Sequence, residues 1–391
     1  MRGLIETRSD EDGIVNASPV IVEKQSQPSV PTVEPSARLI SVDALRGFDM
    51  FWIMGGDLLI RSLQKIHDST VTQELANQME HCEWAGFHFY DLIFPLFVFL
   101  VGVSVTFSIP RLIEHSGKPE AFKRIVIRSV ILFLLGIFYM GGVANGFKNV
   151  YMAGVLHRIA VAYFFAALLF CFFRPKSLVA ICIFLLVGYW ALMTFVPVPG
   201  IGVPSYEQGK NLAYYLDQHY LPGRKFEGTL LSTMPAVANC LFGVFAGLLL
   251  KNKTVPDQKK VYWLVGSGAL SLLLGFLWAQ QFPIIKLLWT STYVLVACGY
   301  SAILLGFFYQ VIEIWKFQRW AQPFIWIGMN AITIYIAANV FRFSKLAERF
   351  AGGNVQKFLD SYGDLVLAII TLGMVFWLTH FLYRRKVFLR L

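Results

Sequence analysis

Charged residues are scarce in this chain, and its 391 residues include only five cysteines. Aspartate, glutamate, lysine and arginine together make up 15% of the residues, whereas hydrophobic residues make up 56%. One soluble core does not bury that much apolar surface in a chain of this length. The scarcity of charge therefore excludes an ordinary soluble globular protein and indicates a membrane protein that crosses the bilayer several times.

The sequence also lacks the motifs of several enzyme classes. It contains no GxGxxG fingerprint, no Walker A loop, no GxSxG elbow and no HExxH pair. Because the histidines show no pairing pattern, no metal site is expected. Cys82 lies alone in a predicted outer loop, so it has no partner there for an intrachain disulfide, and it is a weaker candidate nucleophile than its neighbour His81. The remaining cysteines fall in apolar stretches and are interpreted as small core residues.

What the chain does contain is a series of apolar stretches long enough to cross a bilayer, which takes roughly 20 mostly apolar residues. They predict an all-α polytopic membrane protein with about ten transmembrane helices, near residues 44–62, 91–110, 125–143, 152–173, 178–196, 232–250, 261–279, 288–309, 321–341 and 362–382. The segments FPLFVFLVGVSV and MPAVANCLFGVFAG share an early proline and a later glycine. This similarity raises the hypothesis of a parallel internal repeat, with chance as the alternative.

Lysine and arginine set the expected orientation, because basic residues in short loops stay on the cytoplasmic side. Most of the 34 basic residues fall on one side if the N-terminal tail is cytoplasmic, so both termini are expected in the cytoplasm, with the chain in the inner membrane. Residues 1–37, which have no apolar leader, are predicted to be a disordered tail, and 38–391 to be the transmembrane domain. The excess of Lys and Arg on the cytoplasmic side, which faces anionic lipid headgroups, accounts for the net charge of +10. The lipid bilayer is therefore the expected partner, and nucleic acid is not.

Ionisable residues lie where lipid does not tolerate them. Asp43, Arg46, Asp49 and Asp57 fall in or beside the first predicted span. Each ionised side chain at membrane depth costs at least a few kcal/mol, so such groups normally face the protein interior and pair. Asp43 and Arg46 are alternatively a structural i,i+3 pair at the cytoplasmic interface. Asp57 follows a Gly-Gly pair near the outer end of the span and is predicted to be functional.

A histidine stands in the first outer loop, at about residues 64–90, just before the second span. His81 in EHCEWAGFHFYDLIF is either a solvated surface residue or a catalytic base. Arg158 in GVLHRIA either has a function inside the protein or reaches the outer interface with its long side chain. A second long outer loop, 197–231, is rich in Tyr, Gly and Pro and is suited to covering a polar acceptor. The residues by themselves leave these alternatives open.

Several segments together resemble one family. In order, they are RLISVDALRGFDMFWIMGGD, EHCEWAGFHFYDLIFPLFVFLVGVS, AGVLHRIAVAYF, GTLLSTMPAVANCLFGVFAG, IIKLLWTSTYVLVACG, PFIWIGMNAITIYI and YRRKVFLRL. The resemblance is to the heparan-alpha-glucosaminide N-acetyltransferase family, in its bacterial branch, and it runs from about Arg38 to the C-terminus. It implies a transmembrane acyltransferase in which cytosolic acetyl-CoA gives an acetyl group to an amino sugar or glycan on the far side, and a homodimer like those of the family.

The resemblance also implies site residues. His81, three positions before Trp84, matches the catalytic histidine of the family's HxxW stretch. Asp57 stands where the lysosomal member has asparagine; a carboxylate repels a developing oxyanion, so it is better suited to orienting an imidazolium or accepting a proton from an amine. His157 stands where glutamine is usual, which leaves Arg158 as the matched position. These departures bear on which acceptor the protein uses more than on whether it transfers an acetyl group.

The phosphates of coenzyme A do not cross hydrocarbon, so the acyl end must reach the acceptor through a polar passage. Arg46, Arg124, Arg128 and Arg158 are predicted to bind the cofactor, although positive-inside bias is an alternative for each cytoplasmic arginine. His81 is predicted to act as general base in a direct transfer, with formation of an acetyl-imidazole as the other route. The rival functions are a transporter or flippase of a polar solute and a membrane scaffold without catalysis.

Overall fold

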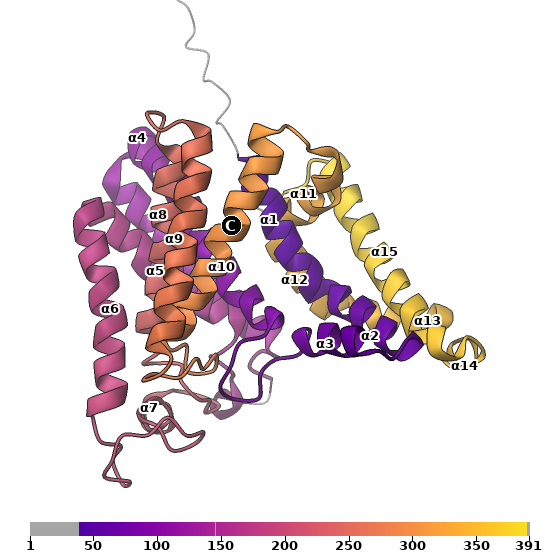
Figure 1. Ribbon diagram of the computed structural model, residues 1–391, viewed down its shortest axis with the longest axis horizontal. Helices are drawn as coiled ribbons and strands as arrows, with labels where there is room; N and C mark the ends of the chain where they lie inside the picture. The colour runs from indigo at the N-terminus through magenta and orange to yellow at the C-terminus, as the bar shows by residue number, and fades with distance from the viewer. Residues whose placement is uncertain (1–38, 145, 389–391) are drawn as a thin grey trace, which may run out of the picture. The chain divides into compact units, whose positions relative to one another are not determined.

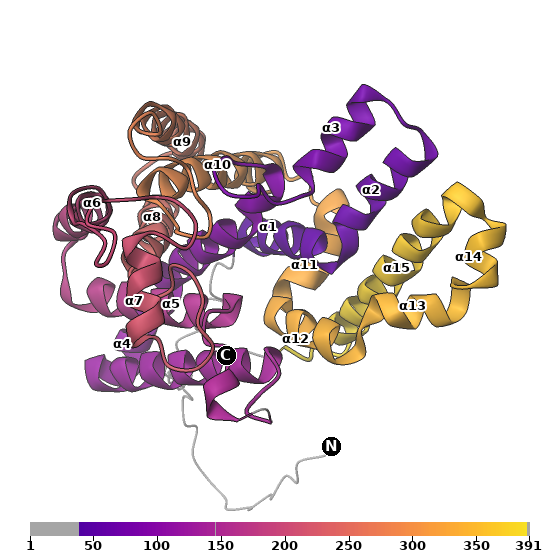
Figure 2. The same cartoon turned by 90° about the horizontal axis from the view of Figure 1, so that it is seen from below.

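The computed structural model describes residues 39–388 except residue 145, and these residues form a helical bundle with no strand (Figure 1; Figure 2). Their only strand-like pairing is one isolated bridge between Ala85 and Ile285. The all-α prediction is therefore confirmed. The tail predicted over 1–37 lies outside the described residues.

Among the described residues, seven helices are long and apolar enough to cross a membrane. They are α4 (Phe89–Tyr139), α5 (Val155–Phe172), α6 (Pro175–Phe195), α8 (Thr233–Lys251), α9 (Asp257–Trp278), α10 (Ser291–Tyr309) with the π-helical turn that extends it to Ile314, and α15 (Gly363–Arg384) with the short turn before it. An eighth span is formed if α11 (Gln322–Met329) and α12 (Ala331–Phe341), which meet at 70°, cross as one broken helix. Neither the predicted count of ten nor the internal repeat is confirmed.

Most of the difference in count arises at two glycines: the two limbs of α4 that meet at Gly117 are counted as one helix, and the first predicted span is broken at Gly55. The 51-residue α4 contains both predicted spans 91–110 and 125–143, and its helix is interrupted at Gly117, where φ is 78°. The first predicted span is divided into α1 (Ile40–Phe51), a π-helical turn (Trp52–Gly56) and α2 (Asp57–Ile66), with Gly55 at φ 124° in the turn. Glycine adopts such positive φ values without steric cost, so the chain changes direction at both places.

The short helices gather at one end of the bundle, the lower end in Figure 1. They are α2, α3 (Thr70–Gln78), α7 (Leu212–Tyr220), α13 (Phe343–Ala351) and α14 (Asn354–Phe358). The two long loops that the sequence assigns to the outer side, 64–90 and 197–231, contribute α3 and α7 to this end. We refer to it as the loop end of the bundle.

Helices α4 and α8 cross at a reciprocal pair of glycines. A Cβ atom on Gly102 would lie 1.9 Å from the carbonyl oxygen of Cys240, and one on Gly243 would lie 1.9 Å from the carbonyl oxygen of Phe99. Only hydrogen side chains permit this approach, which brings the two backbones into contact as in other small-residue crossings of membrane helices. This crossing fixes the part of α4 that leads to the loop end.

Gly102→Ala is expected to lower the stability of the protein by about 1–3 kcal/mol, because the added methyl group forces the α4 and α8 backbones apart. Gly266→Ala is the matched control, since a Cβ there meets nothing within 4 Å. Thermal unfolding of the detergent-solubilised protein measures both. Equal melting temperatures for the two variants would contradict the tight crossing.

Candidate active site

The loop before α4 is held against a second loop that is distant in sequence. Ala85 and Ile285 form an isolated antiparallel bridge, and next to it the backbone N–H of Gly86 donates a hydrogen bond of 2.9 Å to the carbonyl of Ile284. Gly86 has φ 134°, a value that L side chains rarely adopt. The indole N–H of Trp84 donates to the carbonyl of Tyr206 at 3.0 Å, so the long loop 197–231 is attached as well. Three loops are thereby fixed around residues 81–86.

This pairing brings together an imidazole, a carboxylate and an ammonium group. The Nδ1 atom of His81 lies 2.9 Å from Oδ1 of Asp91 and 2.8 Å from Nζ of Lys286. Lys286 Nζ also lies 3.1 Å from Asp91 Oδ1 and 3.2 Å from His81 Nε2. The side chain of His81 is 52% exposed, whereas that of Asp91 is fully buried. We call these residues the His81–Asp91–Lys286 cluster.

Asp91 is held rigidly from several directions. Its Oδ2 atom accepts hydrogen bonds from the backbone N–H groups of Cys82 at 3.3 Å and His88 at 3.1 Å. The bond from His88 also caps the N-terminus of α4. Its backbone carbonyl accepts from the hydroxyl of Tyr293 at 2.7 Å. Because both carboxylate oxygens are engaged, Asp91 fixes the direction of the imidazole.

Lys286 is a cation in a largely buried place. Burial lowers the pKa of Lys286 from its usual value, while the neighbouring Asp91 carboxylate acts in the opposite direction. Neither Lys286 nor Asp91 is among the site residues predicted from the sequence. For Asp91 the available signal was an aspartate at the head of an apolar helix; for Lys286 it was its place in IIKLLWTSTYVLVACG, one of the segments that resemble the family.

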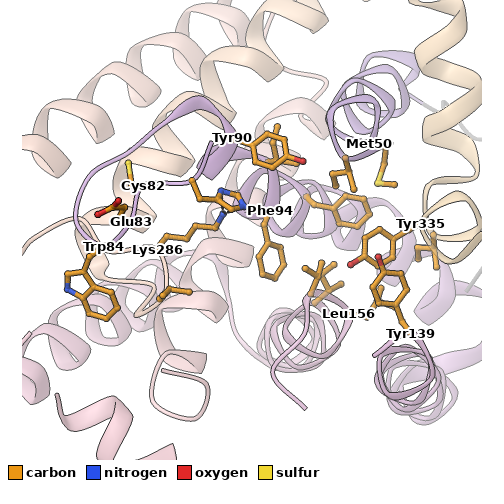
Figure 3. A pocket seen from close by; sticks show the side chains of 18 residues that line it. Met50, Cys82, Glu83, Trp84, Tyr90, Phe94, Tyr139, Leu156, Lys286 and Tyr335 are labelled. Carbon is orange, nitrogen blue, oxygen red and sulfur yellow. Dashed lines mark hydrogen bonds between the residues drawn. The ribbon is translucent and has the colours of Figure 1, made fainter. Parts of the chain in front are cut away.

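The cluster opens into a cavity of about 550 Å³. In Figure 3, Glu83, Trp84 and Lys286 lie at one end of it, and Met50, Tyr139 and Tyr335 at the other. Along α4 the lining extends from Tyr90 to Phe97, which is about 10 Å at the helical rise. The charged groups therefore stand at the loop end, and a mostly apolar chamber, which Tyr139 and Tyr335 also line, continues into the bundle.

Comparison with known proteins identifies the family. Residues 38–281 match the family model described as "Heparan-alpha-glucosaminide N-acetyltransferase, catalytic". The chain belongs to this family. It is 26% identical over 384 residues to heparan-alpha-glucosaminide N-acetyltransferase of Mus musculus, covering 79% of this chain and 56% of that protein. For the Homo sapiens protein of the same name the identity is 26% over 373 residues, covering 79% and 55%. The chain thus spans about half the length of the curated relatives it matches.

This family of membrane N-acetyltransferases is the one that the sequence motifs resemble, so the resemblance is confirmed. His81 and Asp91 lie inside the matched region 38–281, and Lys286 follows its end. The matched region therefore contains His81 and Asp91 but not Lys286. Lys286 reaches them because the loops at Ala85 and Ile285 pair.

Asp57, the second predicted catalytic residue, does not line the cavity. Its carboxylate pairs with Arg61 one helical turn away, at 3.8 Å. Arg61 in turn donates to the carbonyl of Met79 at 2.7 Å and lies 3.4 Å from the carboxylate of Glu80. Asp57 is therefore connected through Arg61 to the segment that precedes His81, and the carboxylate that contacts the imidazole is Asp91.

The four arginines predicted to bind the cofactor do not come together, and none lines the cavity. Arg46 contacts Asp43 at 3.2 Å and Ser104 at 2.8 Å, one turn of α1 beyond the lining residue Met50. Arg124 is exposed and contacts Glu120 at 3.4 Å, and the guanidinium of Arg128 lies 4.6 Å from the ring centre of Tyr163. Arg158 lies 4.6 Å from the ring centre of Trp289 and borders a different cavity.

Ligand atoms of Cys82, His88 and Asp91 lie within 4.8 Å of one another, a spacing that can hold a metal ion. Burial, with the nearby Asp91 carboxylate as a second cause, raises the pKa of the Cys82 thiol to about 11. A thiol with that pKa is protonated at neutral pH and is a poor ligand and a poor nucleophile. Asp91 already accepts the hydrogen bonds of the helix cap, so the chemistry of this group favours a structural role.

Cys82→Ser is therefore expected to retain acetyl transfer within about a factor of two to three, because the protonated thiol performs no step. Alkylation of Cys82 at pH 8 should be roughly 100-fold slower than that of a free cysteine, given the difference in thiolate fraction. Rates of iodoacetamide labelling, followed by peptide mass spectrometry, measure this. Rapid labelling accompanied by complete loss of activity in Cys82→Ser would contradict the assignment.

Proposed function

We propose that this protein is an acyltransferase that moves an acetyl group from cytosolic acetyl-CoA to an amino sugar or glycan on the outer side of the cytoplasmic membrane. The observation that carries the proposal is the half-exposed imidazole of His81, held by the buried Asp91 carboxylate and Lys286 at the mouth of a cavity of about 550 Å³. Both termini are cytoplasmic in this proposal, and the loop end faces outward. A homodimer stays a prediction.

His81 acts as the general base. In this proposal Nδ1–H of His81 donates to Asp91 Oδ1 at 2.9 Å, and Lys286 donates to the same oxygen at 3.1 Å. The Lys286 ammonium, which lies 2.8 Å from Nδ1 and 3.2 Å from Nε2, turns away from the ring when the acceptor binds, and the lone pair on Nε2 is then free. Nε2 then takes a proton from the attacking amine or hydroxyl group of the acceptor. The His81 side chain is accessible enough to meet an acceptor that arrives at the loop end, since half of it is exposed.

The transfer proceeds through one tetrahedral intermediate, without an acylated enzyme. The acceptor nitrogen or oxygen forms a bond to the thioester carbonyl carbon as its proton passes to His81, and the negative charge develops on the carbonyl oxygen. The Lys286 ammonium stabilises that oxyanion. The carbon–sulfur bond then breaks, and the coenzyme A sulfur receives the proton from His81. An acetyl-imidazole on His81 is the alternative route, and radiolabel retained on the protein after treatment with acetyl-CoA alone would favour it.

The pantetheine arm of the donor is proposed to lie in the inner part of the cavity, where the hydroxyl groups of Tyr139 and Tyr335 are polar partners for its amides. Arg46 and its partner Ser104 lie about 10 Å beyond Phe97 along the helices, in the direction away from the loop end. Charge-assisted hydrogen bonds from Arg46, and beyond it Arg124 and Arg128, are proposed for the phosphates at the cytoplasmic face. Asp57 is proposed as a positioning residue that orients Arg61 and, through it, the segment before His81.

Acceptor-dependent release of free thiol tests this function. Purified protein with acetyl-CoA and a panel of amino sugars and glycan fragments is expected to release coenzyme A with at least one acceptor, and the acetylated product should appear in equal amount. A transporter or flippase releases none with any acceptor. Absence of thiol release across the panel, from protein that binds acetyl-CoA, would refute the proposal.

A further inference from the structure

A second cavity of about 350 Å³ lies on the other side of α5 from the active site. Leu156 and Ile159 of α5 line the active-site cavity, whereas His157, Arg158 and Val161 line the second one. At 100° per residue these two sets occupy different faces of the helix. The second cavity is closed by α4, by the start of α8 and by the loop at residues 221–230. Nothing in the proposed reaction uses it.

Polar groups with unused hydrogen-bonding capacity border this cavity. His157 is 2% exposed, and neither of its ring nitrogens has a hydrogen-bond partner among the described residues. The same holds for Nη1 of Arg158. Buried polar groups that are left unpaired lose their hydration without compensation, so a ligand that satisfies them binds favourably.

The charge of Arg158 is not matched by an ion pair within the described part of the chain. Its Nη2 atom donates to the carbonyl of Gly228 at 3.3 Å, and its guanidinium lies over the Trp289 ring. The buried Asp217 carboxylate acts on this charge electrostatically from beyond ion-pair distance, and its oxygens accept from the backbone N–H groups of Thr229 at 2.6 Å and Leu230 at 2.9 Å. An anion is therefore the complementary ligand for this cavity.

The second cavity continues into an apolar groove of about 310 Å³ between α4 and α5. Phe133, Val161 and Phe165 line both spaces. From Phe133 the groove runs along α4 to Val126, about 10 Å away at the helical rise. Phe165 is 42% exposed and Val130 is 50% exposed, so no other described element covers this face. The groove lies on spanning helices and is thus open to hydrocarbon chains.

We propose that the second cavity and the groove form one site for an anionic membrane lipid of the outer leaflet. Its phosphate binds Arg158, beside His157 and Thr229, and one acyl chain lies along Phe133, Val161 and Phe165. An anionic head joined to a long apolar chain is the ligand that matches both halves of the site. This assigns Arg158 a role different from the acetyl-CoA contact expected from the sequence.

Native mass spectrometry of the detergent-purified protein tests the site, with dioleoyl phosphatidylglycerol and dioleoyl phosphatidylcholine as probes. The full chain is expected to retain phosphatidylglycerol preferentially. Arg158→Gln should weaken that binding about tenfold, a loss typical of one charge-assisted phosphate contact. Val161→Trp, which fills the groove and leaves the charge in place, should weaken the binding of both lipids.

Arg224→Gln is the matched control. Arg224 also lies over an aromatic ring at the loop end, 5.9 Å from the centre of Tyr151, but it does not line the cavity. The Arg224→Gln variant should bind phosphatidylglycerol as tightly as the unmodified chain does. Unchanged binding in Arg158→Gln, or glycerol 3-phosphate in solution binding as tightly as the lipid, would overturn the proposal; the latter result would indicate a site for a free phosphate.

Discussion

Replacing His81 with alanine is expected to lower kcat for acetyl transfer by a factor of about 10²–10⁴, the contribution of a positioned general base. The acceptor has no other described group in the cluster that can take its proton, since Asp91 is buried behind the imidazole and Lys286 is cationic. The affinity for acetyl-CoA should change little, because the donor arm is proposed to lie in the inner part of the cavity, away from His81. Steady-state release of thiol and equilibrium binding of acetyl-CoA measure the two effects separately.

The His81→Ala protein should also fold normally, because the side chain is half exposed and leaves no large internal void. His67→Ala is the control, since this exposed histidine stands in the same loop and does not line the cavity. Its kcat should equal that of the unmodified protein. A His81→Ala variant that turns over at the normal rate would show that the base lies elsewhere.

Asp91→Asn is also expected to lower kcat by a factor of about 10²–10⁴, and it should in addition change how the residual activity depends on pH. The amide oxygen still accepts from the backbone of Cys82 and His88, so the helix cap persists. Its NH₂ group, however, donates toward Nδ1 of His81 and selects the tautomer in which Nε2 carries the proton and is no longer a base. Kinetics at several pH values, with circular dichroism as a check on folding, measure the effect.

The pH profile of Asp91→Asn should also change. The Asp91 carboxylate raises the pKa of Lys286, so its removal lowers that pKa further below the usual lysine value. Because the protonated amine stabilises the oxyanion, the fall in residual activity at alkaline pH should move to lower pH. Asp68→Asn, which removes an exposed carboxylate of the same loop, should leave both kcat and the profile unchanged. A normal kcat in Asp91→Asn would contradict the role of the cluster.

The sequence predicted the imidazole but not the whole cluster, for a physical reason. His81 was recognisable because the HxxW motif is local in the chain. Lys286 is 205 residues away and reaches His81 only because the loops at Ala85 and Ile285 pair through their backbones. Backbone pairing between irregular loops leaves no period in the sequence. The pairing of these two loops in space could therefore not be predicted from composition or motif spacing.

The prediction for Asp57 followed from a sound premise, that a charge at membrane depth must pair. Arg61, one turn along the same helix, satisfies that requirement locally, so the carboxylate did not have to reach the cavity. The apolar ranges likewise fell mostly on helices, but Gly55 breaks the first range into two helices and Gly117 bends α4 between the two ranges that it contains. Hydropathy predicts where the chain is apolar, and backbone geometry decides how many straight helices result.

Transfer across a sealed membrane tests the central claim most directly. Protein is reconstituted in vesicles, with acetyl-CoA supplied only at the cytoplasmic face and an amino sugar only at the loop end. The account predicts acetylated sugar on the loop-end side, free coenzyme A on the cytoplasmic side in equal amount, and neither product with His81→Ala. Product that forms only when donor and acceptor share one side would contradict it.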